Sequence, residues 1–143
     1  MIRNLHCVSS ALWRSGRYSA AGLRALVAET GIRTVVDLRD AHRPLLLAES
    51  TYRRLRVDFH RVPLREDEPV PTAAFERVLA LVAAAPALVH CWKGAHRTGA
   101  IVALYRRLSG WTPETAWEEA QRCGFGHAAA HPSLAAQILD ATA

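Results

Sequence analysis

The stretch that most constrains this chain is residues 90–99, which read HCWKGAHRTG between two apolar segments. The apolar run 87–89 is typical of a buried strand, and the apolar run 100–105 is typical of a buried helix. The stretch therefore joins the end of a strand to the start of a helix. Free backbone N–H groups and the helix dipole meet at such a junction, so it favours an anion as ligand.

The side chains of this stretch suit a phosphate ligand. The pKa of a free thiol is about 8.5, and a helix N-terminus beside cations lowers it to about 3.5–7.5. We therefore expect Cys91 to be a thiolate nucleophile. Gly94 lets the chain curl closely around the ligand, and Arg97 can grip two phosphoryl oxygens with its planar fork. The Thr98 hydroxyl would stabilise the departing thiolate when the phosphoenzyme breaks down.

Backbone N–H groups complete the predicted phosphate site. They belong to the six residues that follow the cysteine, namely Trp92, Lys93, Gly94, Ala95, His96 and Arg97.

The pattern His90-Cys91-x-x-Gly94-x-x-Arg97-Thr98-Gly99 resembles the signature of the cysteine-dependent protein tyrosine and dual-specificity phosphatases. The likeness extends along most of the chain. Residues 13–16 and 31–39 resemble the N-terminal segments of compact bacterial dual-specificity-type phosphatases, and residues 110–114 and 124–126 resemble their C-terminal helices. Residues 40–65 carry little of the pattern. The resemblance implies a cysteinyl-phosphate intermediate, with His90 as a support for the loop.

A phosphatase of this kind also needs an acid to protonate the leaving oxygen. The chain has five aspartates: Asp37, Asp40, Asp58, Asp67 and Asp140. Asp67 lies in the polar, proline-rich segment 65–71 between an expected strand and the helix before Cys91, which is where the family carries its acid. We therefore predict Asp67 as the general acid, with Glu66 and Glu68 as the nearest alternatives. Asp37 and Asp40 are the next candidates.

Composition fits one globular domain that acts on anions. The chain has 143 residues, of which 50% are hydrophobic, enough for a real core in a single phosphatase domain over residues 1–143. The net charge of +5 favours anionic substrates, a phosphorylated protein or a small phosphate ester, but no run of like charge indicates nucleic acid. The chain has 17 arginines and one lysine, and that lysine is Lys93 inside the loop.

Cysteine usage indicates a reducing compartment. The three cysteines, Cys7, Cys91 and Cys123, show no CxxC spacing, and their number is odd, which argues against a framework of disulfides. We expect Cys7 and Cys123 to be small core residues. No signal peptide is apparent, and the longest apolar run, residues 79–89, is too short to span a membrane. We expect a cytoplasmic monomer that needs no metal and no cofactor.

Periodicity and capping signals predict an α/β fold, with a mostly parallel central sheet of four to five strands flanked by helices, as in dual-specificity phosphatases. The expected strands are residues 5–8, 12–14, 32–38, 55–62 and 87–90. The expected helices are one capped by Ser19 and ended by Gly31, a short one over 44–50, one capped by Thr72, one over 98–109, one from Thr112-Pro113 to Gly124, and one over 133–140.

Two functions fit these features well, and two others fit them less well. The main hypothesis is a phosphatase acting on phosphotyrosine, extending to phosphoserine and phosphothreonine. His96 beside Arg97 also resembles the atypical phosphatases of inositol pyrophosphates, which keeps inositol phosphates and phosphoinositides open as substrates. A phosphate-binding pseudophosphatase would lack the cysteine, the arginine or the acid, and all three are present. A rhodanese-like sulfurtransferase also uses a strand–cysteine loop–helix, but its loop is usually shorter.

Overall fold

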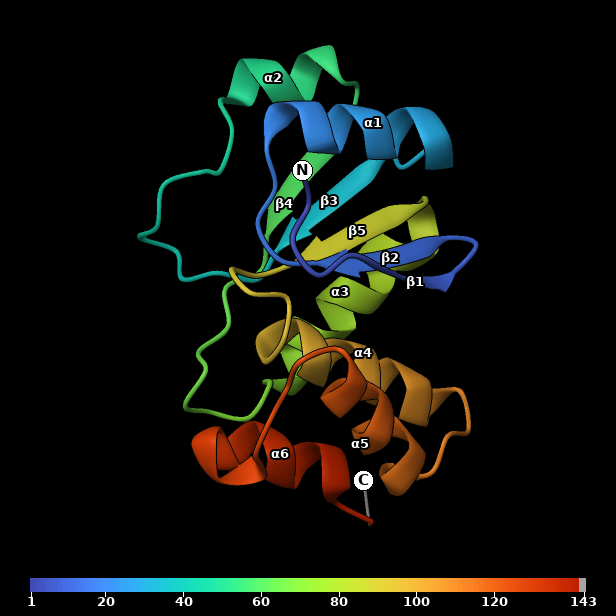
Figure 1. Cartoon of the computed structure of the whole chain (residues 1–143), viewed down its shortest axis with the longest axis vertical. Helices are drawn as coiled ribbons and strands as arrows, with labels where there is room; N and C mark the ends of the chain where they lie inside the picture. The colour runs from blue at the N-terminus through green and yellow to red at the C-terminus, as the bar shows by residue number, and fades with distance from the viewer. Residues whose placement is uncertain (142–143) are drawn as a thin grey trace.

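A five-stranded sheet forms the centre of the molecule in the computed structural model, which describes residues 1–141 (Figure 1). The strands are β1 (His6–Ser9), β2 (Leu12–Ser15), β3 (Thr34–Asp37), β4 (Asp58–Arg61) and β5 (Ala87–His90). Their order is β1-β2-β5-β3-β4, and only β1 runs antiparallel to its neighbour. The mostly parallel α/β sheet predicted from the sequence is therefore confirmed.

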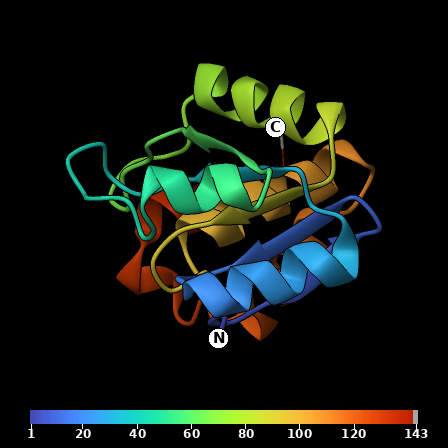
Figure 2. The ribbon, with the colours of Figure 1, turned by 90° about the horizontal axis from the view of Figure 1, so that it is seen from above.

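Helices cover both faces of the sheet (Figures 1 and 2). The helices are α1 (Ala20–Thr30), α2 (Glu49–Arg54), α3 (Thr72–Ala84), α4 (Arg97–Leu108), α5 (Pro113–Arg122) and α6 (Pro132–Leu139), with a short 3-10 turn η1 (Ala128–Ala130). One core cluster joins α1 and α2 to one face, and a second, larger cluster joins α3, α4, α5 and α6 to the other. Strand β5, between β2 and β3, is buried along its whole length and contributes to both clusters.

Three of the predicted helix signals are confirmed. The Ser19 side chain accepts a hydrogen bond from the Gly22 N–H at the start of α1. Gly31 ends α1 with φ of 73°, a left-handed conformation that glycine adopts without strain. Thr112 caps α5 by accepting from the Thr115 N–H.

Three local predictions are wrong. The short helix lies at Glu49–Arg54 instead of 44–50, and residue 44 is not helical; this placement buries Tyr52 in the core with only 3% exposed. The strand expected over 55–62 shrinks to Asp58–Arg61, because Arg56 takes a positive φ of 58° in the turn after α2. The α3 N-cap residue is Pro71, and no side chain caps the helix, so Thr72 does not perform the expected role.

The two cysteines expected in the core have different surroundings. Cys123 is buried at the end of α5, as predicted. Cys7 is exposed, because it lies on β1, the edge strand, where its thiol faces the Ser9 carbonyl at 3.1 Å. The pattern of apolar residues around Cys7 did not reveal that β1 would be an edge.

The register of the strands brings chemistry-bearing residues to one end of the sheet. His90, the last residue of β5, is in register with Ser15 of β2 and with Asp37 of β3. The parallel strands therefore end together, and the loop from β5 to α4 leaves the sheet at this carboxyl edge. Within residues 1–141, no helix combines the length and apolar character needed to cross a membrane.

Candidate active site

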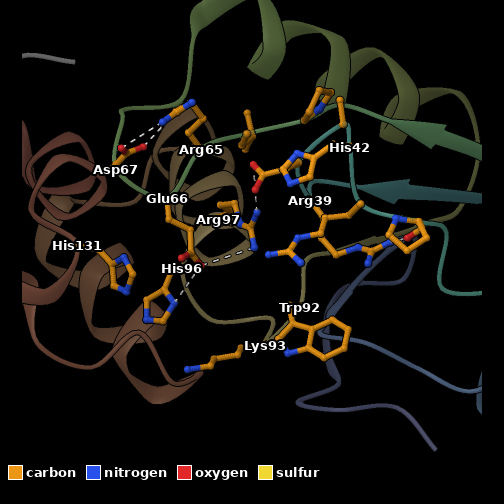
Figure 3. A pocket seen from close by; sticks show the side chains of 16 residues that line it. Arg39, His42, Arg65, Glu66, Asp67, Trp92, Lys93, His96, Arg97 and His131 are labelled. Carbon is orange, nitrogen blue, oxygen red and sulfur yellow. Dashed lines mark hydrogen bonds and ion pairs between the residues drawn. The ribbon is translucent and has the colours of Figure 1, made fainter.

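A cavity of about 1150 Å³ opens at the carboxyl edge of the sheet (Figure 3). One wall is the loop between β5 and α4, here called the cysteine loop (residues 91–97). The opposite walls are residues 39–44, which follow β3, and the segment 63–67, part of what we call the acid loop (residues 63–71). His131 closes the remaining side. Each wall therefore comes from a different part of the chain.

Cys91 lies at the base of the cysteine loop with 1% of its surface exposed. Its Sγ atom receives a hydrogen bond from the Gly94 N–H at 3.3 Å and another from the Thr98 hydroxyl at 3.0 Å. Both donors favour a negatively charged sulfur over a neutral one. The arrangement suits a thiolate that attacks and later departs.

The carbonyl groups of the cysteine loop are bound by the N-terminal part of the chain. The Arg17 N–H donates to the Trp92 carbonyl at 2.9 Å, and Asn4 Nδ2 lies 3.4 Å from the carbonyl oxygens of both Lys93 and Gly94. In a trans peptide the C=O and the following N–H point in opposite directions. Carbonyls that face the N-terminal segment therefore turn the next N–H groups toward the concave side of the loop.

Close backbone approach requires glycine at Gly94. Its φ is +75°, and a Cβ there would collide with the backbone of Ser15 and Gly16. A Cβ on Gly16 would in turn lie 2.6 Å from the Trp92 carbonyl oxygen. These two glycines let the end of β2 pass directly behind the cysteine loop, which explains the glycine at the centre of the motif.

Arg97 is the first residue of α4, and its guanidinium borders the cavity while 8% of the residue is exposed. Two carboxylates lie within ion-pair distance: Glu66 Oε1 at 3.6 Å from Nη2 and Asp40 Oδ1 at 3.9 Å from Nη1. Both distances are too long for good hydrogen bonds. The arginine fork is therefore only loosely engaged and is available to a phosphate (Figure 3).

His90 supports the cysteine loop from below. Its Nδ1 lies 3.2 Å from the Cys91 carbonyl, which can only accept, so Nδ1 carries the proton. Nε2 then accepts from the Tyr18 hydroxyl at 3.1 Å, and Tyr18 in turn meets the Tyr52 hydroxyl at 2.8 Å. Burial lowers the pKa of His90 to about 4, so the imidazole is neutral at physiological pH.

Asp37 carries the wall formed by residues 39–44. Its buried carboxylate binds Arg39 at 2.8 Å and Arg61 at 2.7 Å. Arg39 donates onward to the Pro44 carbonyl at 2.9 Å, and Arg61 donates to the Arg43 carbonyl at 2.6 Å. Although burial opposes ionisation, the hydrogen bonds from Arg39 hold the pKa of Asp37 at about 2. Asp37 is thus a structural anion and is unsuited to donate a proton.

The acid loop presents its three acids differently. Glu66 points toward Arg97 and His96, and its Oε1 lies 3.9 Å from His96 Nδ1. Asp67 lines the cavity, but its carboxylate is turned to Arg65 at 3.2 Å, and this hydrogen bond lowers the pKa of Asp67. Glu68 lies 3.5 Å from the same arginine. Such exposed ion pairs are weak, so they leave Asp67 free to turn inward.

The middle of the cysteine loop has one anchored residue and two exposed ones. His96 Nε2 lies 3.1 Å from the Phe125 carbonyl, and its ring lies against His131 with centroids 3.7 Å apart. Burial, and then the nearby His131, lower the pKa of His96. Trp92 and Lys93 are exposed at the rim, where the Arg17 guanidinium covers the Trp92 ring at 4.5 Å.

Several residues that build this site escaped the sequence analysis. They are Asn4, Arg14, Tyr18, Tyr52 and Gln137. Gln137 of α6 bonds both the N–H and the carbonyl of Val70, at 2.7 and 2.9 Å, and so fixes the end of the acid loop. Only Arg14 left a signal in the sequence, as a charged residue that directly follows the apolar Leu12 and Trp13 in a predicted strand. In the described part of the chain, no group of three His, Cys, Asp or Glu side chains could hold a metal ion.

Comparisons with known proteins identify relatives over most of the chain. The family model described as "DSP-PTPase phosphatase fused to NAD+ Kinase" matches residues 5–135. The dual specificity protein phosphatase TpbA of Pseudomonas aeruginosa is 32% identical over 124 residues, which are 86% of this chain and 56% of TpbA. The chain thus spans little more than half the length of that relative.

Two further matches bear on the site. The crystal structure of a TpbA variant in complex with pTyr has a TM-score of 0.77 and 28% identity, covering 96% of this chain and 84% of that one. The inositol diphosphatase DSP5 of Arabidopsis thaliana is 43% identical over 47 residues, which are 33% of this chain and 23% of DSP5.

The buried neutral His90 predicts how the stability of the protein depends on pH. Its folded pKa of about 4 lies below the ordinary value of 6.5, so the unfolded state binds the extra proton between these values. The free energy of unfolding should therefore fall as pH drops from 6.5 toward 4, by up to about 3 kcal/mol. Urea unfolding at a series of pH values would measure the slope. His90→Gln should flatten it, whereas an unchanged slope would mean that another group is responsible.

Proposed function

Because the chain belongs to the family of dual-specificity-type protein tyrosine phosphatase domains, we propose that it hydrolyses phosphate monoesters through a cysteinyl-phosphate intermediate on Cys91. The observation that carries the proposal is the Cys91 sulfur, which has two hydrogen-bond donors at 3.0 and 3.3 Å in the loop that begins the helix of Arg97. A sulfurtransferase or a simple phosphate-binding domain does not need a cysteine with two hydrogen-bond donors and an arginine in the same loop.

In the first step of the proposed reaction, the Cys91 thiolate attacks phosphorus and the bond from phosphorus to the leaving oxygen breaks. The leaving oxygen takes a proton from the general acid. Arg97 and the loop N–H groups bind the three equatorial oxygens, whose charge they neutralise as the transition state forms. The loose contacts of Arg97 with Glu66 and Asp40 are exchanged for tighter ones to the phosphoryl group.

In the second step, the general base removes a proton from water, the water oxygen attacks phosphorus, and the bond from phosphorus to sulfur breaks. The departing electron pair returns to Cys91 as a thiolate. The Thr98 hydroxyl, 3.0 Å from the sulfur, stabilises this leaving group. Inorganic phosphate is released, and the proton taken from water returns the acid to the protonated form in which it began the cycle.

We assign the general acid and base to Asp67. Its side chain lines the cavity on the acid loop, and its exposed pairing with Arg65 is easily exchanged for contact with a substrate. Glu66 has a different part in this proposal. Its carboxylate lies 3.6 Å from Arg97, so it competes with the incoming phosphate for the guanidinium. Removal of each charge therefore has a distinct kinetic signature.

The favoured substrate is phosphotyrosine in a protein, with phosphoserine and phosphothreonine also accepted. The phosphotyrosine complex of TpbA supports this choice, and the exposed Trp92 ring at the rim offers an aromatic surface to the substrate. The second candidate is an inositol phosphate. Its support is the likeness to DSP5 and three basic side chains on the rim, His42, Arg43 and Lys93, which form no ion pair within residues 1–141. Parallel assays on phosphopeptides and inositol phosphates separate the two.

The cellular setting is part of the proposal as well. The three free thiols suit the reducing cytoplasm. Action as a monomer on a phosphorylated protein or small phosphate ester stays a prediction.

Cys91→Ser should abolish turnover and leave the fold intact, because a serine hydroxyl is not ionised at neutral pH and is a poor nucleophile here. The variant should still bind vanadate or phosphate through Arg97 and the loop amides. Phosphate release and thermal unfolding, measured side by side, test both halves of this expectation. Substantial turnover by the serine variant would contradict the covalent mechanism.

Arg97→Lys should be nearly as inactive as Arg97→Ala, although lysine keeps the charge. The ammonium cannot grip two oxygens in one plane, and loss of such a transition-state contact costs about 3 kcal/mol or more in kcat. The comparison of kcat among the three proteins is the measurement. A lysine variant within a few-fold of the wild type would mean that charge alone matters at this position.

Asp67→Asn should slow hydrolysis of phosphotyrosine by about 10²–10⁴-fold, the usual contribution of a positioned proton donor. An aryl phosphate with an activated leaving group should lose much less, since its oxygen departs without a proton. The variant should also lack the basic limb in the pH profile of kcat/KM for poor leaving groups.

Glu66→Gln is the matched control for Asp67→Asn. It removes a neighbouring charge from the same loop and should lower KM without introducing a dependence on the leaving group, because Arg97 loses its competitor. Glu68→Gln should have little effect on either constant. If Glu66→Gln carried the leaving-group dependence and Asp67→Asn did not, the acid would be Glu66.

A further inference from the structure

Arg14 is a charged side chain buried directly behind the cysteine loop. It lies on β2, in register with Val89 of β5, and only 1% of it is exposed. Its Nη2 donates to the Gly94 carbonyl at 2.9 Å. Within residues 1–141, its Nε and Nη1 atoms have no hydrogen-bond partner although both are buried. Among the described residues, the Gly94 carbonyl is therefore the only hydrogen-bond acceptor of this guanidinium.

A buried cation of this kind is costly unless a counter-charge compensates it. Burial lowers the pKa of Arg14, and the nearby anions or potential anions that oppose the shift are Cys123, Glu119 and Cys91. Glu119 is already engaged, because both of its carboxylate oxygens accept from Arg106 at 3.1 and 3.0 Å. The remaining partners are the thiols of Cys123 and Cys91, and Cys91 is the one that the proposed reaction uses as a thiolate.

Other groups around Arg14 define its electrostatic surroundings. His6 on β1 and Arg106 on α4 repel it, and the two thiols and Glu119 attract it. A Cβ built on Gly99, in the first turn of α4, would lie 3.7 Å from Arg14 Nη2, which is ordinary van der Waals contact, and 3.3 Å from the Phe125 ring. The guanidinium thus reaches the start of the helix whose N-terminus faces the cavity.

We propose that Arg14 is a positioning residue of the active site: it orients the peptide between Gly94 and Ala95 and supplies a buried positive charge that favours the Cys91 thiolate. This inference rests on the proposed function of Cys91 as the nucleophile. Arg14 does not line the cavity, and within residues 1–141 its side chain donates to the Gly94 carbonyl and not to the reacting sulfur. It acts from the side of the loop opposite Arg97.

The orienting effect follows from peptide geometry. Arg14 holds the Gly94 carbonyl toward β2, so the Ala95 N–H of the same planar peptide points the other way, into the concave side of the loop. The Gly94 N–H, on the preceding peptide, is the donor that reaches the Cys91 sulfur at 3.3 Å. One guanidinium contact therefore stabilises the turn that presents both N–H groups.

The electrostatic effect follows from burial. A charge excluded from water is poorly screened, so it acts on Cys91 more strongly than an exposed charge at equal distance. Arg17, which is half-buried and lies over the Trp92 ring, contacts the same loop from its solvent side, so its charge is screened more than that of Arg14. Two arginines from the N-terminal segment thus contact the loop, and Arg14, the more deeply buried of the two, is the better suited to act on the sulfur.

The test measures how fast iodoacetamide alkylates Cys91 as a function of pH, read by mass spectrometry of the peptide that contains it. Only the thiolate reacts, so the midpoint of the profile reports ionisation of this thiol and not of the exposed Cys7. In Arg14→Met the midpoint should move up by about 1 pH unit or more. The kcat/KM of the variant should fall at least about tenfold at neutral pH, with partial recovery at higher pH.

Arg107→Met is the matched control. Arg107 also donates from a half-buried side chain to a backbone carbonyl, that of Ile138 at 3.1 Å, but it lies at the far end of α4 from the cysteine loop. Its loss should lower the melting temperature without moving the alkylation midpoint. A general loosening of the fold would affect both variants alike, and that outcome would overturn the proposal.

Two milder variants keep the test decisive if Arg14→Met does not fold. Arg14→Lys keeps the charge, whereas Arg14→Gln keeps a donor for the Gly94 carbonyl and removes the charge. We expect the glutamine variant to show the raised midpoint and the lysine variant to remain closer to the wild type. If both titrate as the wild type does, Arg14 has no influence on the thiolate. Because alkylation needs no substrate, this result stands even if the protein proves inactive on every phosphate ester.

Discussion

The cysteine loop depends on one constraint: its N–H groups can converge on an anion only if its carbonyl groups are satisfied elsewhere. Here the acceptors are bound from behind by residues of the N-terminal segment, through Arg17, Asn4 and Arg14. Gly16 and Gly94 allow the two backbones to touch. The proposed anion site is therefore a joint product of the strand–loop–helix motif and a segment more than seventy residues earlier in the chain.

A second polar layer lies beneath the first and holds the remaining walls. The neutral His90 connects the Cys91 carbonyl through a chain of hydrogen bonds to two tyrosines. These are Tyr18, just before α1, and Tyr52 of α2. Asp37, in register with His90, binds two arginines that hold residues 40–44 along the cavity. Buried polar groups of this sort are costly unless all are satisfied. The hydrogen bonds of Asp37, His90 and the two tyrosines fix the loops around the site more firmly than apolar packing alone would.

The sequence predicted the features that depend on local pattern. Periodicity predicts the succession of strands and helices along the chain. The residue types that suit helix ends predict the caps at Ser19 and Thr112 and the left-handed Gly31. The proximity of Thr98 to the Cys91 sulfur follows from the helical start after the loop. The local sequence pattern gave wrong predictions where tertiary packing decides the structure. One case is α2, which lies further along the chain than expected and buries Tyr52; the other is the edge strand β1, which leaves Cys7 exposed.

Long-range partners could not be predicted from the sequence, because nothing in a local pattern shows which distant residue will face a loop. Asn4 and Gln137 look like ordinary surface residues, yet each binds backbone groups on a loop of the site. The orientations of Glu66 and Asp67 were equally out of reach, since adjacent acids in a polar loop have the same local signature. The role of Arg14 was visible only as an arginine in an apolar setting.

The order of the strands has a consequence for how the chain acquires this site. Strands β1 and β2 come first in the sequence, but β2 finds its parallel partner only in β5, at residues 87–90. An isolated two-stranded hairpin is marginally stable in water. During synthesis the hairpin must therefore wait until the middle of the sheet has emerged. The cysteine loop is consequently a late product of folding, closed by contacts of high sequence separation, which are slow to form.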